Sequence, residues 1–80
     1  MLTAYIRAAM RKAIYEILED GTFYGEIPIA EGVWSNTNTL ESCRTELQSV
    51  LEGWIILGLQ LGHPLPVIDG ATLVTELEAA

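Results

Sequence analysis

One long helical stripe, which follows directly on three short strand-like segments, limits the possible folds more than any other feature of the sequence. Apolar side chains recur at helical spacing over residues 40–61, about six turns, and Gly62 and Pro64 then end the pattern. The stripe consists of Leu40, Cys43, Leu47, Val50, Leu51, Trp54, Gly58 and Leu61. A helix of this kind must bury its apolar face against another element.

The sequence also predicts the N-terminal cap of this helix. Asn38 or Thr39 precedes the first apolar position, and both residue types accept hydrogen bonds from the first helical N–H groups. Asn38 followed by Glu41 three residues later fits a capping box. We therefore predict that the helix begins close to residue 40.

The preceding region is typical of an antiparallel meander. Residues 13–19 and 23–27 are rich in β-branched and aromatic residues, and Asp20-Gly21 between them is a hairpin signal. Pro28 ends the second segment, and Gly32 turns the chain into a third at 33–36. Strand alternation places Phe23, Gly25 and Ile27 on one face, Tyr24 and Glu26 on the other, and Trp34 opposite in direction to Val33.

The two ends of the chain carry weaker secondary-structure signals. Leu2, Tyr5, Ile6, Ala9 and Met10 predict a short N-terminal helix, in which the late cations Arg7, Arg11 and Lys12 offset the negative end of the helix dipole. Residues 67–69 can pair briefly as a fourth strand, and residues 72–80 are a weak helix or a mobile end.

We therefore predict an α+β two-layer sandwich. It contains a three-stranded antiparallel meander with a possible short fourth strand, one long helix across it, and a short N-terminal helix. Eighty residues make a single domain over 1–80, with its core at about 12–69 and a C-terminal tail at 70–80.

The apolar content predicts self-association. The chain is 50% hydrophobic and only 19% charged, more apolar surface than so small a core can cover. Near its end the long helix is apolar on nearly all sides, so a single sheet cannot cover it. We expect Ile55, Ile56 and Leu59 to lie in a homo-oligomer interface, and Gly53 and Gly58 to let another backbone approach closely.

Charge narrows the choice of partner. A net charge of −7 with only four Lys and Arg residues argues against direct nucleic-acid binding and favours a basic protein partner, although acidity also serves solubility. A lone cysteine, Cys43, indicates a reducing compartment, and no signal peptide or membrane span is visible. We expect a cytoplasmic protein with no membrane partner.

The sequence resembles a known family in the run GTFYGEIPIAEGVW at 21–34, in the helix that opens with TLE at 39–41, and in the WIILGLQLGHPLP stretch that ends at Pro66. Over residues 12–66 this order resembles the HicB-like domain of bacterial toxin–antitoxin systems, a partial, non-catalytic relative of the ribonuclease H fold. The resemblance implies an antitoxin that binds and neutralises a small basic RNA-cleaving toxin, HicA-like in type. Longer members of the family add a DNA-binding domain. The fourteen residues after Pro66 contain no basic residue, so operator binding is not expected.

The candidate partner-binding residues are Glu16, Glu19, Tyr24, Glu26 and Trp34. Carboxylates on a strand face steer a cationic partner, and an aromatic side chain supplies the buried anchor. Two other interpretations stay open. These residues can simply solvate a sheet face, with Trp34 packed at its rim, or the chain can be an orphan oligomeric module that binds a small molecule or a different protein.

Catalysis is not expected. A nuclease of the ribonuclease H type needs several carboxylates that converge on two metal ions. The carboxylates near the predicted strands are Glu16, Glu19, Asp20, Glu26 and Asp69, and a solvated strand face explains them better. His63 is expected to cap the end of the long helix, and Cys43 to be a small buried hydrophobe. We therefore predict no catalytic, metal-binding or cofactor-binding site.

Overall fold

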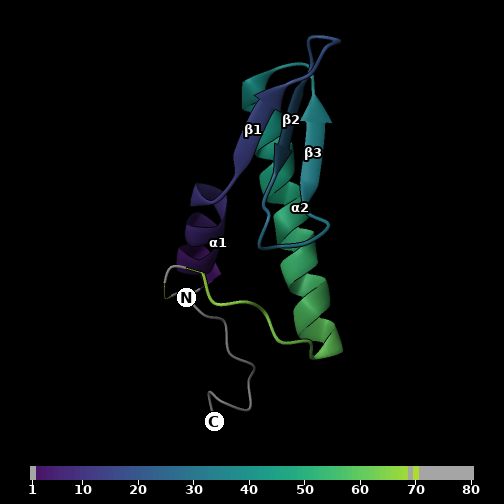
Figure 1. Cartoon of the computed structure of the whole chain (residues 1–80). Helices are drawn as coiled ribbons and strands as arrows, with labels where there is room; N and C mark the ends of the chain where they lie inside the picture. Colours follow the sequence, from purple (N-terminus) through teal and green to yellow (C-terminus); the bar gives the residue numbers. More distant parts are fainter. Residues whose placement is uncertain (1, 69, 71–80) are drawn as a thin grey trace.

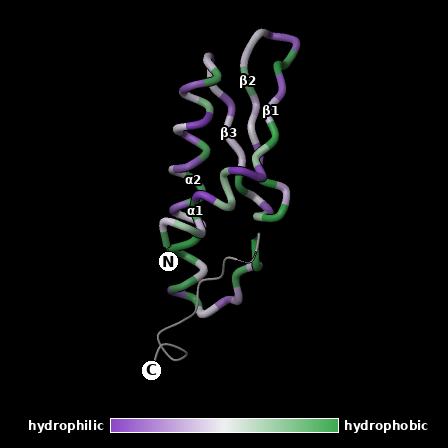
Figure 2. Tube along the Cα trace, turned by 90° about the vertical axis from the view of Figure 1, so that its left-hand side faces the viewer, coloured by the Kyte–Doolittle hydropathy of each residue, from purple (hydrophilic) through white to green (hydrophobic). Residues whose placement is uncertain are grey.

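The fold is described by a computed structural model over residues 2–68 and 70. Its elements in chain order are α1 (Leu2–Arg11), β1 (Ile14–Ile17), β2 (Phe23–Glu26), β3 (Trp34–Thr37) and α2 (Leu40–Leu61). The three strands form one antiparallel sheet in the order β1-β2-β3. Helix α2 runs along one face of the sheet, and α1 lies beside α2 below β1 (Figure 1). The predicted α+β fold is confirmed, and Figure 2 shows α2 and the sheet as two layers.

Each turn of the meander is made by the glycine that the sequence supplies. Gly21 has φ +86° and Gly32 has φ +94°, a region that favours glycine because it has no Cβ. In the first turn the N–H of Leu18 donates to the carbonyl of Thr22 at 2.8 Å. In the second, the N–H of Val33 donates to the carbonyl of Ala30 at 3.0 Å. β1 and β2 are shorter than the predicted segments at 13–19 and 23–27, whereas β3 has the predicted length of four residues but begins one residue later, at Trp34.

At both ends of α2, backbone groups that lack a partner within the helix form hydrogen bonds with neighbouring residues. Thr39 is the N-cap, and its hydroxyl accepts from the N–H of Ser42 at 3.0 Å, so the predicted Asn38 and Glu41 capping box is not the one formed. At the other end Gly62 adopts φ +72°, and the N–H of His63 donates to the carbonyl of Gly58 at 2.9 Å. This bond uses the backbone of His63, so the role expected of its imidazole stays a prediction.

The core lies where α1, the 27–33 connection and the middle of α2 meet. Its buried members are Tyr5, Ala8, Ala9, Ile27, Ala30, Val33, Leu47, Leu51, Ile55 and Ile68. The hydroxyl of Tyr5 donates to the carbonyl of Pro66 at 2.6 Å, which ties α1 to the segment that follows α2. Apolar burial at about 25 cal/mol per Å² makes this cluster the main stabilising part of the domain.

The segment after α2 differs in part from expectation. Among the described residues the predicted fourth strand is reduced to a single bridge residue, Ile68, which is buried. Asp69 and the predicted weak helix or mobile end at 72–80 lie outside the described residues. Ile68 packs in the hydrophobic core, so this segment contributes an apolar contact and not the predicted fourth strand.

Two expectations about α2 are wrong. Ile55 is only 1% exposed, because α1 and the 27–33 connection cover a second side of the helix, so it is a core residue and does not need a second subunit to bury it. The residue that approaches Gly58 closely is Leu65 of the same chain, because an added Cβ would lie 2.8 Å from Leu65 Cδ2. Ile56 and Leu59 remain 55% and 39% exposed, as expected.

Candidate partner-binding surface

The strand register sorts the sheet into an inner face against α2 and an outer face. Across the three strands Ile14, Glu26 and Trp34 form one row, and Glu16, Tyr24 and Asn36 form the next. We call these six residues the outer sheet face. The row between them, Tyr15, Gly25 and Ser35, points the other way and meets Cys43 of α2.

Small residues on the inner face fix this orientation. A Cβ on Gly25 would lie 2.9 Å from the Tyr15 ring and 3.2 Å from the Cys43 sulfur, so only glycine fits without a shift. Ser35 is buried, and its hydroxyl donates to the carbonyl of Cys43 at 2.8 Å. Because a one-residue slip would exchange the two faces, this contact holds the alternate residues outward.

An aromatic pair occupies the centre of the outer sheet face. Tyr24 and Trp34 are diagonal neighbours across β2 and β3 and stack with ring centroids 6.1 Å apart and an interplanar angle of 24°. Trp34 is nevertheless 54% exposed, because the described residues place no second layer over it. Trp34 points away from Val33, which is buried, as the strand alternation predicted.

The carboxylates flank this pair. The Tyr24 hydroxyl donates to Glu26 Oε1 at 2.9 Å, and this hydrogen bond raises the pKa of Tyr24 because it favours the protonated phenol. Glu16 is exposed and pairs with Tyr24 across β1 and β2. Both carboxylates therefore lie beside the aromatic rings.

Four of the five candidate residues gather on this face, and Glu19 does not. Glu19 is exposed in the turn between β1 and β2, at one end of the sheet (Figure 1). Two outer residues were not among the candidates: Ile14, 54% exposed, and Asn36. The same period of two that places Glu16 outward also places Ile14 there, so alternation counted back from Glu16 would have found it.

The other candidate chemical groups do not converge in the described part of the chain. No three His, Cys, Asp or Glu side chains within residues 2–68 and 70 are arranged to hold a metal ion. Asp20 accepts from the N–H and the hydroxyl of Thr22 at 2.9 and 2.6 Å, and these hydrogen bonds lower the pKa of its carboxyl. Asp20 therefore stabilises the turn, Cys43 is buried as expected, and Asp69 lies outside the described range.

Within the described residues, neither helix combines the length and the apolar character that crossing a bilayer requires.

Comparison with known proteins gives the family. The pattern of the UPF0150-like family matches residues 4–66, a range that contains most of α1, all three strands and α2. The chain belongs to the UPF0150-like family. This UPF0150-like domain is also similar to the crystal structure of TTHA0281 from Thermus thermophilus, with a TM-score of 0.86 and 36% sequence identity over 91% of each chain. Comparison with curated proteins gives no match.

The UPF0150-like domain presents a second, apolar surface on α2. Ile56, Leu57, Leu59 and Leu61 are all at least 39% exposed near the end of the helix. Leu2, Ile6, Ile56 and Leu59 border a small hollow of about 210 Å³. Apart from Leu2, the residues of this surface and of the outer sheet face lie within the range that matches the family.

Proposed function

We propose that this UPF0150-like domain is a HicB-like antitoxin that binds and neutralises a small basic RNA-cleaving toxin of the HicA-like type. The observation that carries the proposal is the outer sheet face, where an exposed aromatic pair is flanked by Glu16 and Glu26. The net charge of −7 supports a cationic partner. The domain acts by occupying the toxin surface and performs no chemistry itself.

Each group on the face has a separate part in the proposed complex. Glu16, with Glu19 at the end of the sheet, attracts the basic toxin over a distance and speeds association. Trp34 is the anchor, since an aromatic ring that is half exposed in the free domain is buried on binding and slows release. Tyr24 stacks on Trp34 and holds it in place before the partner arrives.

The first experiment identifies the partner. The full chain, tagged and purified from its native cell, is expected to bring down a small basic protein whose RNA cleavage stops when the chain is added. If no small basic protein co-purifies, or if the one that does still cleaves RNA in the complex, the antitoxin proposal is wrong.

The second experiment locates the contact. Glu16→Lys is expected to slow association and flatten its salt dependence, whereas Glu46→Lys, the same charge change on exposed α2, is the matched control. Trp34→Ala is expected to speed dissociation and weaken binding by about 2 kcal/mol, roughly thirtyfold, with the exposed Leu40→Ala as control. If control and test variants behave alike, the toxin does not bind the outer sheet face.

A second function, an oligomeric binding module without a toxin, is favoured by the apolar surface of α2. Ile56 and Leu59 remain exposed in the single chain, and burial against another copy removes them from water. The double variant Ile56→Lys and Leu59→Lys is expected to reduce the mass in solution to that of one chain. A wild-type chain that is monomeric at high micromolar concentration would exclude this interface.

A further inference from the structure

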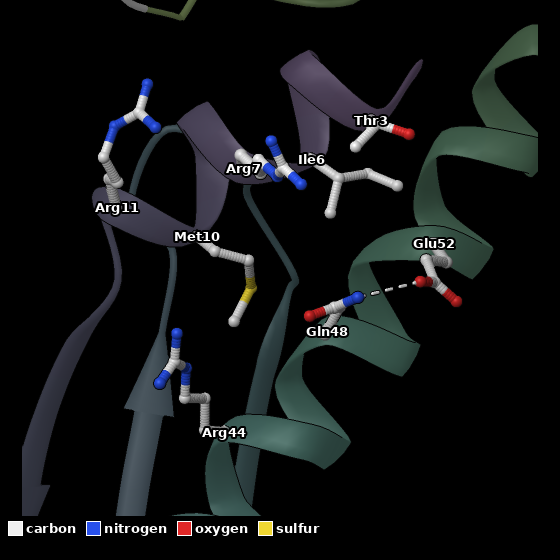
Figure 3. Close-up of a pocket in the computed structure, with 8 residues that line it drawn as sticks. All are labelled: Thr3, Ile6, Arg7, Met10, Arg11, Arg44, Gln48 and Glu52. Atoms are coloured by element: carbon white, nitrogen blue, oxygen red, sulfur yellow. Dashed lines mark hydrogen bonds between the residues drawn. The ribbon is translucent and has the colours of Figure 1, made fainter.

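A groove between the two helices collects most of the positive charge in this acidic chain. It has a volume of about 650 Å³ and is lined by Thr3, Ile6, Arg7, Met10 and Arg11 of α1 and by Arg44, Gln48 and Glu52 of α2 (Figure 3). The sequence contains four Lys and Arg residues, and its three arginines all line this groove.

Helical spacing places arginines on both helices that border the groove. Arg7 and Arg11 are one turn apart on α1, and Arg44, Gln48 and Glu52 follow one another at intervals of four on α2. Figure 3 shows Arg7 and Arg44 on either side of Met10, whose side chain extends into the space between the helices. The groove therefore offers cations from two separate elements with an apolar floor between them.

The acidic side chain of the groove is held within its own helix. Glu52 Oε2 accepts from Gln48 Nε2 at 3.2 Å, a contact within α2. The guanidinium groups of Arg7 and Arg44 line the groove together with this single carboxylate. These two cations outnumber the carboxylate, so the groove suits an added anion.

Arg44 reaches the groove from α2, whereas Arg7 and Arg11 reach it from α1. Arg7 and Arg11 lie in the last turns of α1, where cations offset the negative end of the helix dipole. Arg44 lies in the second turn of α2, beyond the first turn to which the effect of the helix dipole is largely confined. Figure 3 shows it across Met10 from Arg7, where both side chains line the groove.

We propose that the α1–α2 groove binds a compact polyanion with two or more carboxylate or phosphate groups. Arginine is suited to both groups because its planar fork donates two parallel hydrogen bonds to one anion. The volume lies within the roughly 300–1,000 Å³ that small-molecule sites occupy. The groove residues are distinct from those of the outer sheet face, so the site is independent of the antitoxin proposal.

Citrate and pyrophosphate are the probes, one for each chemical group. Each is titrated into the full-length chain at constant ionic strength, with sodium chloride as the reference, and binding is followed by calorimetry and by the midpoint of thermal unfolding. We expect saturable binding with one site per chain and a Kd below about 1 mM for at least one probe. Binding by citrate alone or by pyrophosphate alone supports the site and assigns its ligand to carboxylates or to phosphates.

Single substitutions then place the ligand. Arg44→Gln and Arg7→Gln are each expected to weaken binding about tenfold or more, since each removes a charge-assisted hydrogen bond. Gln60→Glu on exposed α2 changes the net charge by the same one unit outside the groove and is expected to leave affinity unchanged. Absence of binding beyond the chloride reference, or equal weakening by Gln60→Glu, would overturn the proposal.

Discussion

The two glycines inside α2 allow a test of whether the helix packs against its own chain or against another copy. Gly53 is exposed, and an added Cβ would meet nothing within 4 Å. Alanine is a better helix former than glycine by about 1 kcal/mol, so Gly53→Ala is expected to raise the free energy of unfolding by that amount. Gly58→Ala gains the same helix term, but its Cβ would lie 2.8 Å from Leu65 Cδ2.

The cost at Gly58 comes from Leu65, which packs against the core. Moving its side chain off a staggered rotamer costs on the order of 0.5–1.5 kcal/mol, so the two effects at Gly58 nearly cancel. Thermal unfolding at several protein concentrations separates the variants, because about 1 kcal/mol corresponds to roughly 4–8 °C in Tm for a domain of this size. Equal stabilisation by both variants would show that the Leu65 contact has no energetic effect. Destabilisation by Gly53→Ala that depends on protein concentration would show that another copy packs on α2.

Three further substitutions test local features of the fold. Thr39→Ala removes the N-cap of α2 and is expected to lower the free energy of unfolding by about 1 kcal/mol in urea titrations, and no loss would show that the cap adds nothing. The pKa of Asp20 is lowered in the folded chain by the hydrogen bonds from Thr22, so its stabilisation is present above about pH 4 and is lost as the pH falls through the lowered value. Tm measured from neutral to acid pH should therefore fall less steeply for Asp20→Ala, and parallel curves would contradict this reasoning. Glu26→Ala is expected to return the raised pKa of Tyr24 toward its ordinary value in an NMR titration of the ring, and an unchanged value would rule out the hydrogen bond as its cause.

Local patterns in the sequence predicted the elements and the sheet faces well. The glycine turns, the strand alternation and the helical stripe each depend on neighbours a few residues away, so Trp34 was placed outward and Cys43 inward without a structure. The position of α1 depends on contacts between distant segments. Its periodicity shows which side is apolar but not which element covers it. Ile55 was misplaced for this reason, since the prediction allowed α2 only one covering layer.

The candidate surfaces also differ in whether local sequence patterns or contacts between distant segments define them. Glu16, Tyr24, Glu26 and Trp34 were singled out by residue type, and the register brings them onto one face, while their role as contacts stays a prediction. The arginine groove was not found from the sequence. Arg7 and Arg11 were read as dipole partners within one helix, and nothing in the local pattern connects them with Arg44 on the other.

The bond between Tyr5 and Pro66 has a consequence for how the chain is made. It joins positions 61 residues apart, and the buried Ile68 adds a second contribution from the far end of the described chain. On the ribosome, Tyr5 and its apolar neighbours emerge early, and their cover is incomplete until residues 66–68 follow. Contacts of such long sequence separation form late, so the domain is expected to acquire its native state only after residues 66–68 have emerged. Until then the apolar side of α1 is open to chaperones and to other nascent chains.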